Sequence, residues 1–178
     1  MRMTTLARRY AGALFQAAKE ADVIDKVESD LGLITYSIQT IPRLEAIITH
    51  PLIPAARKKE IAADIFRGKI EEVTLLFLNL LIDKRRGEIL EEVEAQYVVL
   101  ANDFRGVAPV TAVSAVTLTP DEQKRLQAKL EEFTGKKVEL SLQEDPSLIG
   151  GLTVKIGDTV IDGSVTGYLA SLKRQLLG

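Results

Sequence analysis

The chain has 178 residues, of which 46% are hydrophobic and 27% charged, a composition that allows a buried core and excludes a mostly disordered chain. The net charge of -2 divides evenly, because residues 1–105 hold 15 Lys and Arg against 16 Asp and Glu, and residues 106–178 hold 8 against 9. Neither half has the basic excess that phosphate-backbone binding requires, and the lack of cysteine excludes disulfides, thiolate nucleophiles and cysteine-bound metals.

The first hundred residues predict a bundle of six short helices. Residues 4–21 place apolar side chains over an arc of about 200°, which is wider than packing against one core requires. We therefore expect this first helix to contact a partner as well as the core. Further helices are predicted over about residues 23–38, in a short piece that ends at Ile48, and over residues 55–66, with prolines at the breaks between them.

The fifth predicted helix is apolar on nearly all sides. Residues 73–82, VTLLFLNLLI, are apolar at eight of ten positions. A membrane-spanning helix needs about 20 such residues, so this run is expected to be a buried helix of the bundle, or one that meets the core on one face and a partner on another. A sixth helix follows from Ile89 to Phe104 and ends near Gly106.

The sequence pattern changes near residue 106, where we place a domain boundary. Residues 110–118 are rich in β-branched side chains and alternate loosely between apolar and polar, as strands do. A capping box that begins at Thr119 starts a helix that is predicted to end at Gly135. A second strand is predicted over about residues 138–142, where leucine and valine alternate with polar residues.

The stretch GGLTVKIGDTVIDGSV, residues 150–165, predicts a β-hairpin that leads into a final helix. We interpret its glycines and aspartates structurally, as a strand entry, a two-residue turn and a helix start, at Gly150, Gly151, Gly157, Asp158, Asp162 and Gly163. Asp162 is expected to cap the last helix, whose inner stripe is Val165, Leu169, Leu172 and Leu176. The fold expected is α + α/β: a six-helix bundle over residues 1–105 and a small β-α-β-β-α domain over residues 106–178.

No catalytic, cofactor or metal motif accompanies these elements. The glycine-rich stretch lacks the Gly-Lys-Ser/Thr ending of a phosphate loop and the GxGxxG spacing of a dinucleotide site. Asp158 and Asp162 lack the regularly spaced oxygen ligands of a calcium loop, and His50, the single histidine, has no partner for a zinc site or a nucleophile–base pair. We expect no enzyme activity, no cofactor and no metal. A site made of carboxylates that are distant in sequence and meet only in the fold stays open as an alternative.

The two ends of the chain resemble one known family. The segment GGLTVKIGDTVIDGSVTGYLASL, preceded by DPSLI at residues 145–149, is similar to the C-terminal signature of the delta subunit of F-type ATP synthases. That subunit is known in mitochondria as the oligomycin-sensitivity-conferring protein. Residues 7–15, ARRYAGALF, resemble the opening helix of the same family, whereas residues 25–140 match it only in pattern.

The resemblance implies a non-catalytic stator subunit, present in one copy per complex. Its helical domain would bind the N-terminal segments of the alpha subunits on top of the catalytic head, and its C-terminal domain would meet the b subunits of the peripheral stalk. In that position the chain would hold the head against the torque of the rotor. We expect the alpha subunits at Tyr10, Ala11, Leu14, Leu76 and Leu80, and the b subunits at Val165, Leu169, Leu172 and Leu176. Core packing is the alternative at each of these positions.

Two other functional classes fit the sequence less well. A small RNA-binding α+β module would share the hairpin and helix, but residues 106–178 are net acidic and hold only Phe133 and Tyr168 as aromatics. A small hydrolase would need a nucleophile–base pair or a metal set. Because the first helix begins so near Met1, we expect no transit peptide, and a complex at the cytoplasmic face of a bacterial cell membrane. We expect no membrane insertion by this chain and no nucleic-acid partner.

Overall fold

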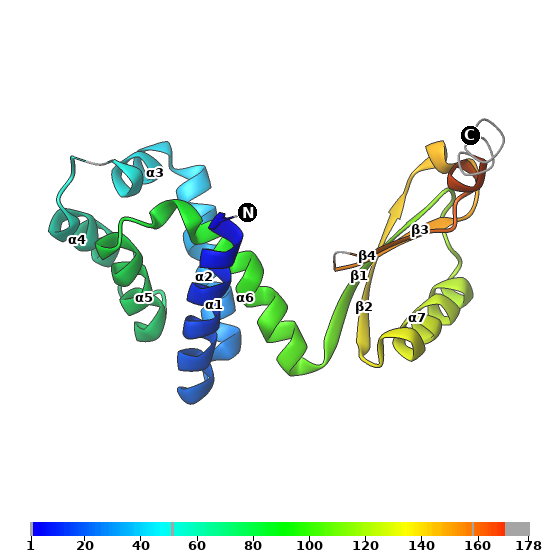
Figure 1. Ribbon diagram of the computed structural model, residues 1–178, viewed down its shortest axis with the longest axis horizontal. Coiled ribbons are helices and arrows are strands. Elements are labelled where there is room, and N and C mark those ends of the chain that lie inside the picture. Colours follow the sequence, from blue (N-terminus) through cyan, green and yellow to red (C-terminus); the bar gives the residue numbers. More distant parts are fainter. Residues whose placement is uncertain (1, 51, 158, 170–178) are drawn as a thin grey trace. The chain divides into compact units, whose positions relative to one another are not determined.

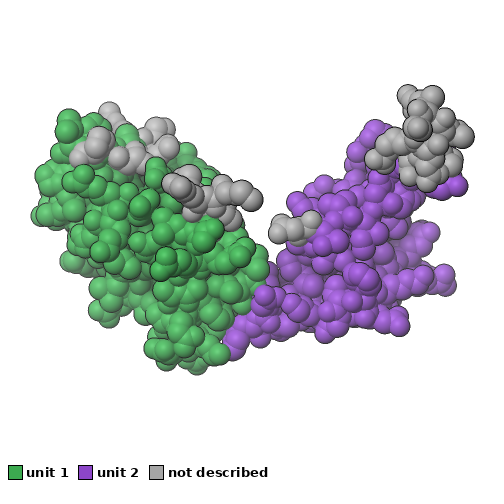
Figure 2. Space-filling view, viewed as in Figure 1, with its two compact units in different colours: residues 1–101 green, residues 102–178 purple. Residues whose placement is uncertain are grey.

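The computed structural model of the protein describes residues 2–50, 52–157 and 159–169. The chain folds as two compact units, residues 1–101 and 102–178, which are coloured separately in Figure 2. The division lies in the last turns of a helix, a few residues before the boundary expected near residue 106. Each unit has a hydrophobic core of its own.

The first unit is built from helices (Figure 1). Their bounds are α1 (Arg2–Glu20), α2 (Ile24–Thr40), α3 (Pro42–Thr49), α4 (Ala55–Phe66), α5 (Glu72–Asp83), the short 3-10 helix η1 (Gly87–Ile89) and α6 (Leu90–Arg105). The end of α6 extends into the second unit. The apolar run at residues 73–82 forms most of α5, as expected for a helix of the bundle. Across the described residues, no helix combines the length and the apolar character needed to cross a membrane.

The core of the first unit forms around α1. Four side chains of this helix are 0–2% exposed: Ala7, Ala11, Leu14 and Ala18. On one flank of the buried stripe, the ring of Phe15 meets that of Tyr97 in α6 edge-on, with centroids 5.8 Å apart. On the other flank, Tyr10 meets Phe77 of α5 edge-on, at 6.3 Å. Three of the four buried side chains are alanines, which allow α5 and α2 to approach α1 closely. The aromatic pairs add contacts with α5 on one flank and with α6 on the other.

The start of α5 is capped by a residue that is distant in sequence. The N-cap residue Glu71 makes no capping hydrogen bond through its own side chain. Instead, the Oδ2 atom of Asp30 in α2 accepts hydrogen bonds from the Glu71 amide and from Thr74 Oγ1, both at 2.8 Å. Asp30 is buried and Thr74 is fully buried. Because unpaired donors would be costly at this depth, the carboxylate ties α2 to α5.

The second unit contains a four-stranded sheet, with strand order β2-β1-β3-β4. Its elements are β1 (Val107–Ser114), α7 (Pro120–Thr134), β2 (Lys137–Glu144), the 3-10 turn η2 (Pro146–Leu148), β3 (Leu152–Ile156) and β4 (Thr159–Asp162). Strands β1 and β2 are parallel and are joined through α7, whereas the pairs β1–β3 and β3–β4 are antiparallel. Residues 165–169 begin a further helix, at which the described part of the chain ends.

Local sequence signals account for the helix and the hairpin of this unit. Thr119 and Glu122 form both hydrogen bonds of the expected capping box, and Gly135 ends α7 in the left-handed conformation, with φ 66°. Strands β3 and β4 pair Ile156 with Thr159, which confirms the expected two-residue turn. One face of the sheet is covered by α7 (Figure 1), and there Val110, Val138 and Leu130 lie in the core.

The first strand begins earlier than expected from the sequence. We predicted a strand over residues 110–118, after Pro109, but β1 runs from Val107 to Ser114. The pairing of β1 with β3 extends only to Val110, so Pro109 lies beyond the last pair with that strand and its missing N–H costs no hydrogen bond there. The pairing of β1 with β2 and with β3 ends at Ser114.

We expect replacement of Asp30 to destabilise the first unit. Asp30→Ala removes the acceptor for two buried or partly buried donors, and the free energy of unfolding should fall by about 2–4 kcal/mol. The measurement is urea unfolding of the full chain. Asp64→Ala removes an exposed carboxylate from α4 and serves as the control, with an expected change within about 0.5 kcal/mol. Equal effects of the two substitutions would contradict the capping role.

Candidate partner-binding surfaces

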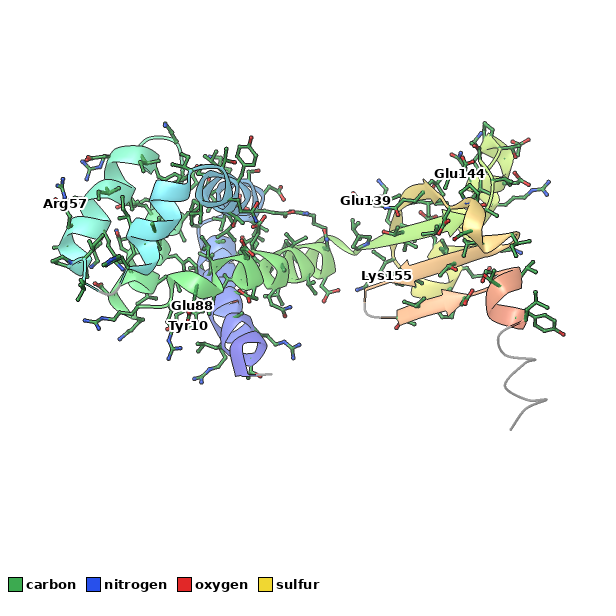
Figure 3. All side chains as sticks on the ribbon, turned by 90° about the horizontal axis from the view of Figure 1, so that it is seen from above. Tyr10, Arg57, Glu88, Glu139, Glu144 and Lys155 are labelled. Atoms are coloured by element: carbon green, nitrogen blue, oxygen red, sulfur yellow. The ribbon has the colours of Figure 1, made fainter. Side chains whose placement is uncertain are left out.

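The first candidate surface lies between α1 and α5. Leu76 and Leu80, one turn apart on α5, are 61% and 42% exposed. At 100° per residue, Leu80 lies about 60° round the helix from Phe77, and Leu76 lies about 40° further in the same direction. The other buried residues of α5 lie on the opposite side of Phe77: Thr74, Leu78, Leu81 and Ile82. Because Phe77 contacts Tyr10 of α1, both exposed leucines lie beyond this contact, on the flank of α5 next to α1. Figure 3 labels Tyr10 among the side chains of the helical unit.

The expected head-binding set needs a correction on α1. Ala11 and Leu14 are 0% and 2% exposed, so their side chains belong to the core and offer no surface to a partner. The exposed apolar positions of α1 on the Tyr10 side are instead Ala13 and Ala17, which lie about 60° and 20° from Tyr10 round the helix. The sequence showed that the apolar arc was too wide for one core, but alanines do not indicate which part of the arc the neighbouring helices cover.

The second candidate surface is the start of the last helix. Val165 and Leu169 are 42% and 53% exposed, and Leu172 and Leu176 lie outside the described residues. Tyr168, which was not among the expected contacts, is 67% exposed. The amide of Val165 donates to the Gly150 carbonyl oxygen at 2.9 Å, so the helix start is fixed to the strand entry. An apolar and aromatic surface therefore stands on a defined part of the second unit.

The signature glycines allow close contact between two backbone segments. Gly151 has φ 79°, and a Cβ atom at this position would clash with the Gly163 carbonyl oxygen. Gly163 itself lies close to the Leu152 carbonyl oxygen, to which its amide donates at 3.0 Å. Gly157 has φ 56° in the hairpin turn, where its surroundings are open, and Asp158 lies outside the described residues. The glycines are thus explained by backbone geometry.

Asp162 does not cap the last helix directly, which corrects our expectation. The cap is Ser164, whose Oγ accepts a hydrogen bond from the Gly167 amide at 3.0 Å. Oδ1 of Asp162 accepts from the hydroxyl and the amide of Ser164, at 2.6 and 2.9 Å, and from Thr153 Oγ1 at 3.3 Å. The hydrogen bond from the Ser164 hydroxyl, followed by that from its amide, lowers the pKa of Asp162. Aspartate and serine are about equally good N-cap residues, so the sequence alone does not decide between Asp162 and Ser164.

Gly167 completes this arrangement, and it was not expected to matter. A Cβ atom at Gly167 would clash with the carboxylate of Asp162, so only glycine leaves room for that carboxylate against the first turn of the helix. In the sequence, Gly163 and Gly167 have the spacing of a membrane-helix motif. Here the second of these glycines leaves room for the Asp162 carboxylate instead. The hairpin and the last helix are thereby joined through one hydrogen-bonded cluster.

The described residues contain no group of three or more His, Asp or Glu side chains placed to hold a metal ion. His50 is exposed, and its Nδ1 accepts a hydrogen bond from the Leu52 amide at 3.2 Å. What the two units present is apolar surface on helices, and such surface suits contact with other protein chains. The class of protein that this defines is a subunit of an assembly.

Comparison with known proteins identifies the assembly. The sequence profile of the ATP synthase delta (OSCP) subunit matches residues 6–176. The chain is 38% identical to the ATP synthase subunit delta of Syntrophomonas wolfei, over 97% of this chain and 94% of that protein. It is 40% identical to that of Chloroherpeton thalassium, over 98% and 95%. The chain belongs to the ATP synthase delta (OSCP) subunit family, and the resemblance stated from the sequence is confirmed.

Solved structures share the fold. A chain in the cryo-EM structure of the Toxoplasma gondii mitochondrial ATP synthase hexamer superposes with a TM-score of 0.70, at 21% identity, over 97% of this chain and 98% of that one. A chain in a cryo-EM structure of the Polytomella F-ATP synthase, refined on its F1 head and rotor, gives a TM-score of 0.51 at 23% identity, over 55% of this chain and 88% of that one. The fold is therefore shared with a chain of the Toxoplasma gondii complex over nearly its whole length, and with a chain of the Polytomella complex over about half of it.

The lowered pKa of Asp162 predicts a pH-dependent contribution to stability. The ordinary pKa of an aspartate carboxyl is 3.8, and that of Asp162 is lower in the folded state. The ionised carboxylate therefore stabilises the fold above about pH 4, and this contribution is lost as the pH falls through the lower folded-state pKa. Wild type should therefore have a higher thermal unfolding midpoint than Asp162→Asn at pH 6, and the difference should shrink between pH 4 and pH 2.5.

The control for this comparison is Glu139→Gln, which removes an exposed carboxylate from β2 of the same unit. Its midpoint should differ less from wild type at pH 6, because Asp162 has three hydrogen-bond donors within reach. A difference between wild type and Asp162→Asn that stays constant from pH 6 to pH 2.5 would show that the carboxylate does not stabilise the folded state.

Proposed function

We propose that this protein is the non-catalytic stator subunit that links the alpha subunits of the catalytic head to the b subunits of the peripheral stalk. In this role it resists the rotor torque during ATP synthesis. Membership of the ATP synthase delta (OSCP) subunit family carries the proposal, and the separate apolar surfaces on the two units support it. One copy would serve each complex, peripheral to the membrane at its cytoplasmic face in a bacterium.

The helical unit, residues 1–101, would bind the alpha subunits. An amphipathic N-terminal helix of an alpha subunit would lie along the flanks of α1 and α5, with its apolar side against Ala13, Ala17, Leu76 and Leu80. Tyr10 and Phe77 would form the base of this contact. Covering Leu76 and Leu80 would contribute about 1–2 kcal/mol each, since about half of each side chain is still exposed.

The second unit, residues 102–178, would bind the stalk. Val165, Tyr168 and Leu169 present exposed apolar and aromatic area at the start of the last helix. Leu172 and Leu176 continue the same stripe in the sequence and belong to the proposed contact. The b subunits would meet this helix, whose orientation is set by the cluster around Asp162 and Ser164.

The experiment is a calorimetric titration of the full chain with a synthetic peptide of the N-terminal segment of the alpha subunit from the same organism. We expect saturable 1:1 binding. Leu76→Asp and Leu80→Asp should each weaken it by at least about tenfold, because each replaces covered apolar surface with a charge that loses its water. Circular dichroism and the thermal midpoint check that each variant is folded.

Leu33→Asp is the matched control, because Leu33 is a leucine of 40% exposure that lies on α2. It should bind the peptide as wild type does. If all three variants lost affinity equally while folded, the surface between α1 and α5 would not be the binding site. If the folded wild-type chain did not bind the peptide, the proposed link to the alpha subunits would be wrong.

A further inference from the structure

A pocket of about 390 Å³ lies in the helical unit, between the end of α3, the start of α4 and the turn after α5. Six of the residues that line it are apolar: Ile48, Leu52, Ile53, Pro54, Ala55 and Ile82. Three charged residues complete it, Lys58, Arg85 and Glu88, so the lining carries two positive charges against one negative. Figure 3 labels Glu88 among the side chains of this unit. None of these residues belongs to the exposed flank formed by Ala13, Ala17, Leu76 and Leu80.

Lys58 is an unusual wall residue because its charged side chain is buried. It is 8% exposed, and its Nζ donates to the Ile48 carbonyl oxygen at 2.5 Å. That carbonyl is in the last turn of α3, so the hydrogen bond caps the helix. It uses one of the three N–H donors of the Lys58 ammonium. Among the described residues no carboxylate pairs with Lys58, although a buried cation normally requires a partner.

Arg85 brings a second cation to the same pocket at the cost of backbone strain. It has φ 53°, a left-handed conformation that glycine adopts most easily after a helix. The turn that requires this conformation is closed by hydrogen bonds from the Arg85 amide to Ile82 O and from the Arg86 amide to Leu81 O, at 3.0 and 2.9 Å. An arginine at a position suited to glycine places a guanidinium-bearing side chain on the pocket wall.

Gly87 fixes the close approach of η1 to α3 at this pocket. A Cβ atom at Gly87 would clash with Ile48 Cγ2, so the two segments could not be this close with any larger residue. Three of the lining residues therefore lie on packed helices: Ile48 on α3, Lys58 on α4 and Ile82 on α5. Arg85 is exposed, in the turn after α5. A site of this kind is preformed and can bind a ligand with little reorganisation.

We propose that this pocket binds a small amphipathic anion, a carboxylate carried on an apolar chain. The carboxylate would accept the remaining hydrogens of the Lys58 ammonium and a hydrogen bond from Arg85, and the chain would lie against Ile48, Ile53 and Ile82. A buried cation in an apolar wall favours this ligand class over neutral or cationic ones of the same shape. The proposal does not rest on the stator role, because none of its residues belongs to the proposed alpha or b surfaces.

The test uses the full chain and octanoate as the probe, with octan-1-ol as a neutral probe of equal length. Binding is followed by calorimetry and by chemical-shift changes of the isoleucine methyl groups. We expect saturable binding of octanoate, with shifts concentrated at Ile48, Ile53 and Ile82, and binding of octan-1-ol that is at least about tenfold weaker. Lys58→Met keeps most of the apolar stem of the side chain and should weaken octanoate by about tenfold or more.

Two further variants keep the result decisive. Arg85→Gly removes the second cation and relieves the left-handed backbone, so it should fold well and still weaken octanoate. Lys69→Met removes an exposed lysine outside the pocket and should leave octanoate binding unchanged. Equal binding of octanoate and octan-1-ol, or a loss in Lys69→Met as large as in the two pocket variants, would overturn the proposal. So would unchanged octanoate binding in a folded Arg85→Gly and a folded Lys58→Met.

Discussion

The packing of α1 against α2 and α5, with an aromatic contact to α6, is the constraint on which the helical unit depends. Its buried stripe consists of small side chains and one leucine, so α1 can approach its neighbours closely without a large core of its own. Edge-on aromatic pairs then fix the two flanks, Tyr10 with Phe77 and Phe15 with Tyr97. Because the buried stripe uses only part of an apolar arc, the remainder stays exposed beside α5. The same packing thus forms the core and leaves a surface for another chain.

The second unit depends on a different kind of constraint, which is close approach of backbone segments. Gly151 allows the strand entry to lie against Gly163, and the Asp162 carboxylate fits against the helix start only because residue 167 is glycine. These contacts determine where the last helix leaves the sheet, and therefore where Val165, Tyr168 and Leu169 are presented. Apolar residues at the surface of a small unit are useful for binding only if they are held in place, and this cluster holds them.

Sequence reasoning predicted the features that local signals encode. The capping box at Thr119, the turn at Gly157 and the apolar run of α5 each follow from a few neighbouring residues. It failed where the outcome depends on distant residues. Whether Leu14 or Ala13 faces outward depends on where α5 lies, and the capping of α5 by Asp30 joins residues 41 positions apart in the chain. The cap at Ser164 was misassigned because Asp162 is an equally good cap in sequence terms.

The stator role is tested most directly by proton-driven ATP synthesis in vesicles that contain the whole complex with this chain. Two double variants are compared with wild type, Leu76→Asp with Leu80→Asp in the helical unit and Val165→Asp with Leu169→Asp in the second unit. We predict that each folded variant abolishes most proton-driven synthesis, while ATP hydrolysis by the detached catalytic head continues, because either broken link lets the head turn with the rotor. Full synthesis with both folded variants incorporated would contradict the proposed link between head and stalk.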